Sequence, residues 1–151
     1  MIELLINDFK KVLELSGLNP GDYVIHFEVT GVPHQVPKWR NGFSAIYIFH
    51  YGDSVLKIGK AGSKSKLRFT SQHYSAKAAK STLARSLVND EEFAKSHNVN
   101  EKNIADWIKN NTARTSLFVD ANYGVFVLNL LEAFLHCRLK PVYEGFKSQT
   151  S

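Results

Sequence analysis

The segment 125–135 constrains the fold most, because it is almost entirely apolar and yet contains a carboxylate, Glu132. An unpaired buried charge is costly, so Glu132 needs a cation, a hydrogen-bond network or a water-filled cleft. If residues 123–139 form one helix, Asn129, Glu132 and His136 make one polar stripe on an apolar rod. The segment therefore predicts an apolar helix that forms one wall of a site. The alternative is that Glu132 caps a neighbouring backbone or pairs with a lysine or arginine.

Length and composition predict one globular domain over residues 1–151. The chain has 151 residues, of which 44% are hydrophobic and 12% aromatic, which is enough for a real core but not for two full domains. No apolar run approaches the roughly 18 residues that a membrane span needs. We therefore expect no membrane partner.

The N-terminal residues lack the basic flank and the small-residue cleavage site of a signal peptide, and the single Cys137 cannot form an internal disulfide. These features favour a reducing, cytoplasmic compartment. Nineteen Lys and Arg residues against fourteen Asp and Glu residues give a net charge of +5. This charge favours a polyanionic partner without identifying one.

Hydrophobic periodicity predicts the order of the elements. We expect a helix over Ile2 to Leu15, strands over 23–29, 45–49, 54–58 and 114–120, a mainly helical stretch over 75–111, and the apolar helix over 123–139. The fold class is therefore α/β (α+β), with a small, mainly antiparallel three-stranded sheet flanked by helices. Residues 1–43 would form an N-terminal extension, and 44–146 the core, with 75–111 as a helical insert.

Five short pieces follow one another along this order: Ala45-Ile46-Tyr47, then Lys57-Ile58-Gly59-Lys60-Ala61, then Arg68 to Tyr74 (Arg-Phe-x-Ser-Gln-His-Tyr), then Glu132, then Pro141-x-x-Glu144. As an ordered set they resemble the GIY-YIG nuclease family, in particular small bacterial members that carry the Arg-Phe-x-Ser-Gln-His-Tyr stretch. The resemblance covers residues 45–144. Each piece alone is weak, and the specificity lies in their order and spacing.

Three positions depart from the family pattern. Ala45 stands where the first motif usually has Gly, which a strand tolerates. Lys57 stands where the second motif usually has Tyr, so the role of that tyrosine is either absent or supplied elsewhere, with Tyr74 or His73 as candidates. Glu144 stands where the family usually has Asn.

The resemblance implies a metal-dependent DNA endonuclease. Glu132 would hold Mg²⁺ (or Mn²⁺), Arg68 would bind the phosphate, Tyr47 would orient or deprotonate water, and His73 would share base or phosphate-binding work. Phosphodiester hydrolysis independently needs an activated water and positive charge at the phosphoryl oxygens. A tyrosine base also needs neighbouring positive charge, for which Lys57 and Lys60 are candidates, because an unperturbed phenol titrates near 10.

Basic residues with an interleaved aromatic predict the DNA contacts, and in sufficient number they make binding salt-dependent. They are Lys38, Trp39, Arg40, Lys57, Lys60, Lys64, Lys66, Lys77, Lys80 and Arg85. A dimer is compatible with this function. Two alternatives remain: a nucleic-acid-binding protein of the same fold without turnover, and a protein-interaction module that uses the apolar helix.

Overall fold

The computed structural model describes residues 1–79 and 81–143, and within them the chain has an α+β architecture. One antiparallel sheet has the strand order β1-β4-β2-β3, from β1 (Ile25–Thr30), β2 (Phe43–Tyr51), β3 (Ser54–Ala61) and β4 (Ala113–Asp120). Strands β2 and β3 form the predicted hairpin, and its tight turn contains Gly52 at φ 55°. That positive φ favours glycine.

The prediction of three strands is wrong, because the described residues contain a fourth strand in the same sheet. Strand β1 was predicted from its own sequence, but it pairs with β4 from Ile25 opposite Val119 to Thr30 opposite Arg114. The segment 1–43 therefore contributes an edge strand to the sheet that holds the predicted motifs. Pairing partners so far apart in the chain leave no mark on local periodicity.

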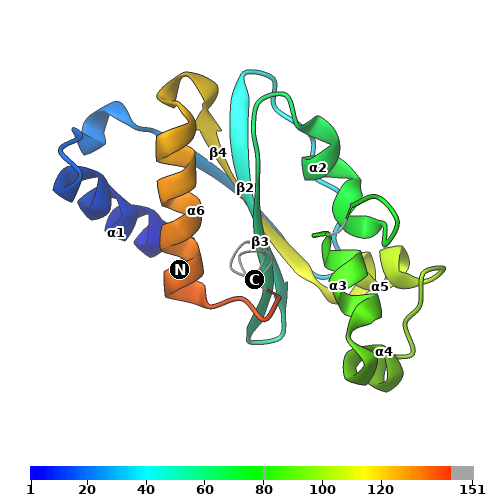
Figure 1. Cartoon of the computed structure of the whole chain (residues 1–151). Helices are drawn as coiled ribbons and strands as arrows, with labels where there is room; N and C mark the ends of the chain where they lie inside the picture. The colour runs from blue at the N-terminus through cyan, green and yellow to red at the C-terminus, as the bar shows by residue number, and fades with distance from the viewer. Residues whose placement is uncertain (80, 144–151) are drawn as a thin grey trace, which may run out of the picture.

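Helices α1 (Ile2–Leu15) and α6 (Val125–Leu139) cover one face of the sheet (Figure 1). Phe9 and Leu13 of α1 and Leu131 and Leu135 of α6 belong to the hydrophobic cluster on that face. The bounds of α1 agree with the prediction. Helix α6 begins at Val125 instead of 123, because Gly124 at φ 89° separates it from a 3₁₀ turn.

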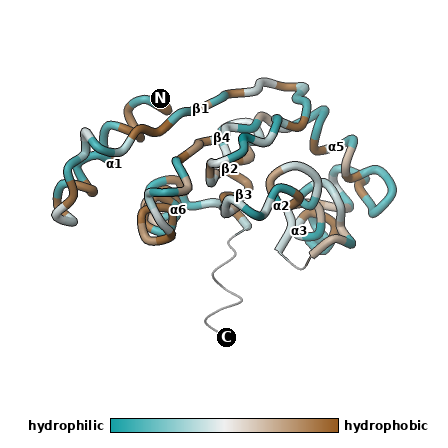
Figure 2. Tube along the Cα trace, turned by 90° about the horizontal axis from the view of Figure 1, so that it is seen from above, coloured by the Kyte–Doolittle hydropathy of each residue, from teal (hydrophilic) through white to brown (hydrophobic). Residues whose placement is uncertain are grey.

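The opposite face is covered by α2 (Lys66–Thr70), α3 (Leu83–Asn89), α4 (Glu91–His97) and α5 (Ile104–Asn111). Seen from above, α2, α3 and α5 lie across the sheet from α1 and α6 (Figure 2). In its described residues, the predicted helical insert 75–111 is thus three separate helices, α3, α4 and α5, preceded by a turn at residues 76–78. Leu83, Leu87 and Ile108 are fully buried beside Tyr47 and Phe49. Among the described residues, these helices and the facing side of the sheet form one hydrophobic cluster.

Side-chain caps mark the N-terminal ends of α3 and α4. The Thr82 hydroxyl accepts a hydrogen bond from the Arg85 N–H, and the Asp90 carboxylate accepts one from the Phe93 N–H. Such caps satisfy N–H groups that a helix start leaves unpaired. None of the helices in the described ranges has the length and apolarity to cross a membrane.

Candidate active site

Tyr47 lies in the middle of β2 and is fully buried. Its partner across the hairpin is Gly59 of β3. A Cβ atom at residue 59 would lie 2.6 Å from the Tyr47 ring, closer than non-bonded carbon atoms approach. Glycine is therefore required there, because it leaves room for the ring to lie against the backbone of β3.

His73 makes the shortest polar contact to Tyr47. Its Nε2 lies 2.6 Å from the Tyr47 hydroxyl oxygen, and its Nδ1 accepts a hydrogen bond from the Leu83 N–H at 3.0 Å. The accepted bond assigns the proton of the neutral ring to Nε2, so His73 donates to Tyr47. Burial, and then the charges of Arg68 and Lys57, hold the pKa of His73 well below its usual range. His73 therefore acts on Tyr47 as a neutral donor.

The acidity of Tyr47 reflects opposing effects. Burial raises the pKa of Tyr47 to about 12, while the charges of Arg68 and Arg114 lower it and that of Glu132 raises it. A hydrogen bond that the oxygen accepts from His73 favours the phenolate. The positive charges that lower the pKa of Tyr47 are those of Arg68 and Arg114, whereas Lys57 and Lys60 were expected in this role. The effect of burial on the pKa is larger than that of both arginines.

The positive charge of Arg68 affects the pKa values of three neighbouring residues. Arg68 lies on α2, partly buried, and its Nη2 donates to the Ser81 hydroxyl at 2.9 Å. Its charge acts on Tyr47, His73 and Lys57. A guanidinium held this way at the rim of the cluster keeps further donors for a phosphate.

Lys57 differs from the other predicted DNA-binding residues because its side chain is only 4% exposed. It stands opposite Phe49 in the hairpin, on the same face of the sheet as Tyr47. Burial and the charge of Arg68 lower the pKa of Lys57 to about 8. The structure therefore places Lys57 near Tyr47, His73 and Arg68, hereafter the Tyr47 cluster, rather than on an open surface.

Glu132 of α6 contacts β3 through the side chain of Lys60. The Lys60 ammonium lies 3.1 Å from the Glu132 carboxylate and donates to the Asn129 side-chain oxygen at 2.5 Å. The Lys60 carbonyl accepts a long, 3.4 Å hydrogen bond from Tyr47. Lys60 thus links the α6 residues to the Tyr47 cluster. In the predicted polar stripe, the Nδ1 atom of His136 lies 2.9 Å from the backbone carbonyl oxygen of Glu132.

Glu132 and Asn129 are the residues of the candidate site whose side-chain oxygens could contribute to holding a metal ion. Within residues 1–79 and 81–143, no group of three or more His, Cys, Asp and Glu side chains is arranged to hold one. Mg²⁺ prefers oxygen ligands and keeps several waters, so it needs few protein ligands. A carboxylate and an amide oxygen that already converge on a cation, the Lys60 ammonium, satisfy that chemistry.

Arg114 is fully buried, and its guanidinium carbon lies 5.2 Å from the centre of the Tyr47 ring. This arginine was not predicted as part of the site. Its Nη1 donates to the Tyr74 hydroxyl at 3.0 Å and its Nη2 to the Phe69 carbonyl at 2.6 Å. His34 Nε2 lies 2.8 Å from the same Tyr74 hydroxyl. Tyr74 is thus engaged with Arg114 and His34, and of the two candidates only His73 contacts Tyr47. No local pattern predicts this burial, since arginine is usually exposed.

The remaining predicted DNA-binding residues lie on several elements. Lys38, Lys64 and Lys66 are exposed, and Trp39 packs on Phe69, beside Arg68, with ring centroids 5.3 Å apart. Arg40 lies 4.0 Å from the centre of the Phe118 ring. Lys77 and Arg85 line one cavity of about 290 Å³, where Lys77 also pairs with Glu101 at 3.6 Å. Lys80 and Glu144 lie outside the described residues.

We expect Gly59→Ala to disturb both the fold and the site, because the new methyl group would overlap the buried Tyr47 ring. Overpacking of this kind costs about 1–3 kcal/mol of unfolding free energy, which urea denaturation measures. Gly62→Ala is the matched control, because no heavy atom lies within 4 Å of its Cβ position. Equal stability of the two variants would contradict the close approach of Tyr47 to residue 59.

No protein-family model, curated protein or solved structure matches this chain. Its function is therefore inferred from the residues of the site.

Proposed function

We propose that the chain is a metal-dependent DNA endonuclease of the GIY-YIG type. The contact that carries the proposal is the 2.6 Å hydrogen bond between Tyr47 and His73, because Arg68 and Glu132 both act electrostatically on the same tyrosine. These four residues come from β2, α2, the 3₁₀ turn Gln72–Tyr74 and α6. Their convergence from separate segments supports the assignment that their order in the chain predicts.

In this proposal Tyr47 accepts the proton of the attacking water. The Nε2 proton of His73 stabilises the phenolate, and the buried ring holds the oxygen in place. Arg68 places a guanidinium against the phosphoryl oxygens. Lys57, in place of the second tyrosine, adds positive charge beside Arg68. Mg²⁺ held by Glu132 and Asn129 would polarise a phosphoryl oxygen.

A second candidate function is DNA binding without cleavage. It is favoured by one contact, the ion pair of Glu132 with Lys60 at 3.1 Å, which neutralises the carboxylate without a metal. The Lys60 side chain is 41% exposed, so it can also leave Glu132 for solvent or a phosphate. The endonuclease is preferred because DNA binding alone gives no reason for the buried Tyr47–His73 pair.

Plasmid cleavage separates the two functions. We expect supercoiled plasmid to be nicked or linearised with Mg²⁺ and to stay intact with a chelator. A mobility shift at several salt concentrations measures binding in parallel. Salt-dependent binding without cleavage in Mg²⁺ or Mn²⁺ would favour the second candidate, and absence of both would overturn the proposal.

The pH dependence of cleavage tests the roles of Tyr47 and Lys57. The phenolate fraction rises about tenfold per pH unit below the Tyr47 pKa of about 12, whereas the Lys57 ammonium is lost above its pKa of about 8. We therefore expect the rate to climb up to about pH 8 and then level. Lys57→Met should be slower at neutral pH but should keep climbing past pH 8. The same break in wild type and variant would remove Lys57 from the mechanism.

We expect Lys77→Ala/Arg85→Ala to weaken DNA binding and flatten its salt dependence. Each lost phosphate contact lowers the slope of log affinity against log salt by about 0.9 for duplex DNA. The control is Lys10→Ala/Lys11→Ala on α1, across the sheet, which removes the same charge. Equal slopes for both double variants would show that the DNA does not contact the cavity lined by Lys77 and Arg85.

A further inference from the structure

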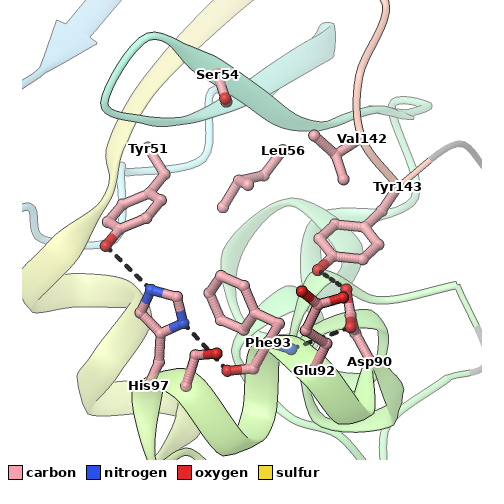
Figure 3. A pocket seen from close by; sticks show the side chains of 10 residues that line it. Tyr51, Ser54, Leu56, Asp90, Glu92, Phe93, His97, Val142 and Tyr143 are labelled. Atoms are coloured by element: carbon pink, nitrogen blue, oxygen red, sulfur yellow. Dashed lines mark hydrogen bonds between the residues drawn. The ribbon is translucent and has the colours of Figure 1, made fainter.

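A cavity of about 340 Å³ lies at the turn end of the β2–β3 hairpin (Figure 3). Its walls come from Tyr51 of β2, Ser54 and Leu56 of β3, α4, and residues 142–143. The last wall is anchored, because the Val142 N–H donates to the Val55 carbonyl at 2.9 Å and the Tyr143 N–H to the Leu56 carbonyl at 2.8 Å. Tyr51 follows Tyr47 by four residues along β2, or about 13 Å, so the cavity is separate from the proposed active site.

Aromatic rings form one side of the cavity. Phe93 and His97 stack with centroids 4.0 Å apart, and Tyr51 meets Phe93 at 6.4 Å. Trp107 packs against both, with ring centroids 5.1 Å from Phe93 and 5.2 Å from Tyr51. Rings locked by each other present a preformed surface, and their faces attract cations.

Carboxylates form the other side. Asp90 accepts hydrogen bonds from the Tyr143 hydroxyl at 2.6 Å and from the Phe93 N–H at 3.1 Å. These bonds, the Tyr143 bond first, lower the pKa of Asp90, so the group is ionised at neutral pH. Glu92 adds a second, exposed carboxylate to the lining. The chain has a net charge of +5, but the carboxylates of Asp90 and Glu92 make this cavity locally acidic. It therefore does not suit a phosphate.

We propose that this cavity, hereafter the aromatic-acidic pocket, binds a primary alkylammonium group. The N–H donors of such a group match the oxygens of the Asp90 and Glu92 carboxylates, which both line the cavity. Its alkyl chain fits against Leu56, Phe93 and Val142, and its charge against the ring faces. The source is either a free amine or the side chain of a lysine in a partner. The proposal does not depend on the nuclease function.

Calorimetric titration of the full chain with n-butylammonium and with n-butanol tests the pocket. We expect the amine to bind in the millimolar range and the alcohol, which has the same chain without the charge, to bind at least about tenfold more weakly. Equal affinities for the amine and the alcohol would show that the cavity binds only the alkyl chain, and this would overturn the proposal. Absence of amine binding would overturn it too.

Substitutions locate the binding. Asp90→Asn/Glu92→Gln removes both charges while asparagine can still cap α4 and accept from Tyr143, so the fold should survive, as a thermal melt checks. We expect this variant to lose at least about tenfold in amine affinity. Glu91→Gln is the control, because Glu91 shares the first turn of α4 but does not line the pocket. An equal loss in the control would mean diffuse attraction and would contradict the site.

Two further ligands identify the source of the ammonium group. Tighter binding of 1,4-diaminobutane than of Nα-acetyl-lysine-N-methylamide assigns the pocket to small free amines, and the reverse order assigns it to a lysine side chain. Loss of binding for both in Asp90→Asn/Glu92→Gln confirms that they use the pocket. Unchanged binding of both in that variant would overturn the proposal.

Discussion

Replacing Glu132 by alanine should abolish Mg²⁺-dependent cleavage while DNA binding and the fold persist. The substitution removes the only carboxylate of the proposed metal site, and a catalytic metal contributes several kcal/mol of transition-state stabilisation. Cleavage at saturating DNA should therefore fall by about a thousandfold or more, which plasmid nicking assays measure. The fold should survive because the partner, Lys60, is partly exposed and can move into solvent.

Asp8→Ala is the matched control for Glu132→Ala. It breaks another ion pair of α6, between Asp8 and Arg138 at 2.6 Å, whose carboxylate is also partly buried. Thermal melts should give similar stability for the two variants, whereas cleavage should be lost only in Glu132→Ala. If Glu132→Ala unfolds the chain, the carboxylate is needed for the fold. If the folded variant cleaves at the wild-type rate, Glu132 has no part in catalysis.

Tyr47→Phe should lower the cleavage rate by about 10² to 10⁴, the usual contribution of a positioned acid or base. The variant keeps the ring over Gly59 and removes only the hydroxyl that His73 contacts at 2.6 Å. It leaves the His73 N–H without its partner, so we also expect a loss of about 1–3 kcal/mol in unfolding free energy. DNA affinity should change little, because the substitution leaves the charges of Arg68 and Lys57 in place.

Tyr74→Phe separates the catalytic effect from the loss of stability. It removes another buried tyrosine hydroxyl on the same side of the sheet, the one that contacts His34 and Arg114. We expect a comparable loss of stability with cleavage reduced much less. Equal cleavage rates for the two variants, measured at a temperature where both are folded, would mean that the Tyr47 hydroxyl does not activate the water.

The regular elements were predictable because each is recorded in local periodicity. Helix α1 has apolar residues at helical spacing, and its bounds agree with the prediction. Strands β2 and β4 read as β-rich runs, and α6 as an apolar rod with Glu132 near its middle. The helices of 75–111 were expected, but their role in one of the hydrophobic clusters was not. Their apolar residues are spread among polar ones over short helices.

The candidate site was predicted as a set of residue types and not as a set of contacts. The order of the motifs singled out Tyr47, Arg68, His73 and Glu132. It did not reveal that His73 is bonded to Tyr47 through Nε2, or that Lys57 is buried with a lowered pKa. Nor did it reveal that the ammonium of Lys60, which is predicted to bind DNA, contacts Glu132 and Asn129.

The sequence alone determined roughly where helices and strands form, because the periodicity of apolar residues is a local property of the chain. It also determined which side chains could carry chemistry, because that depends on residue type. The tertiary structure decided the rest: β1 completes the sheet, Arg114 is buried beneath the site, and Gly59 admits the Tyr47 ring. These outcomes join residues that are distant in the chain. They follow from strand pairing and close packing, which no local pattern encodes.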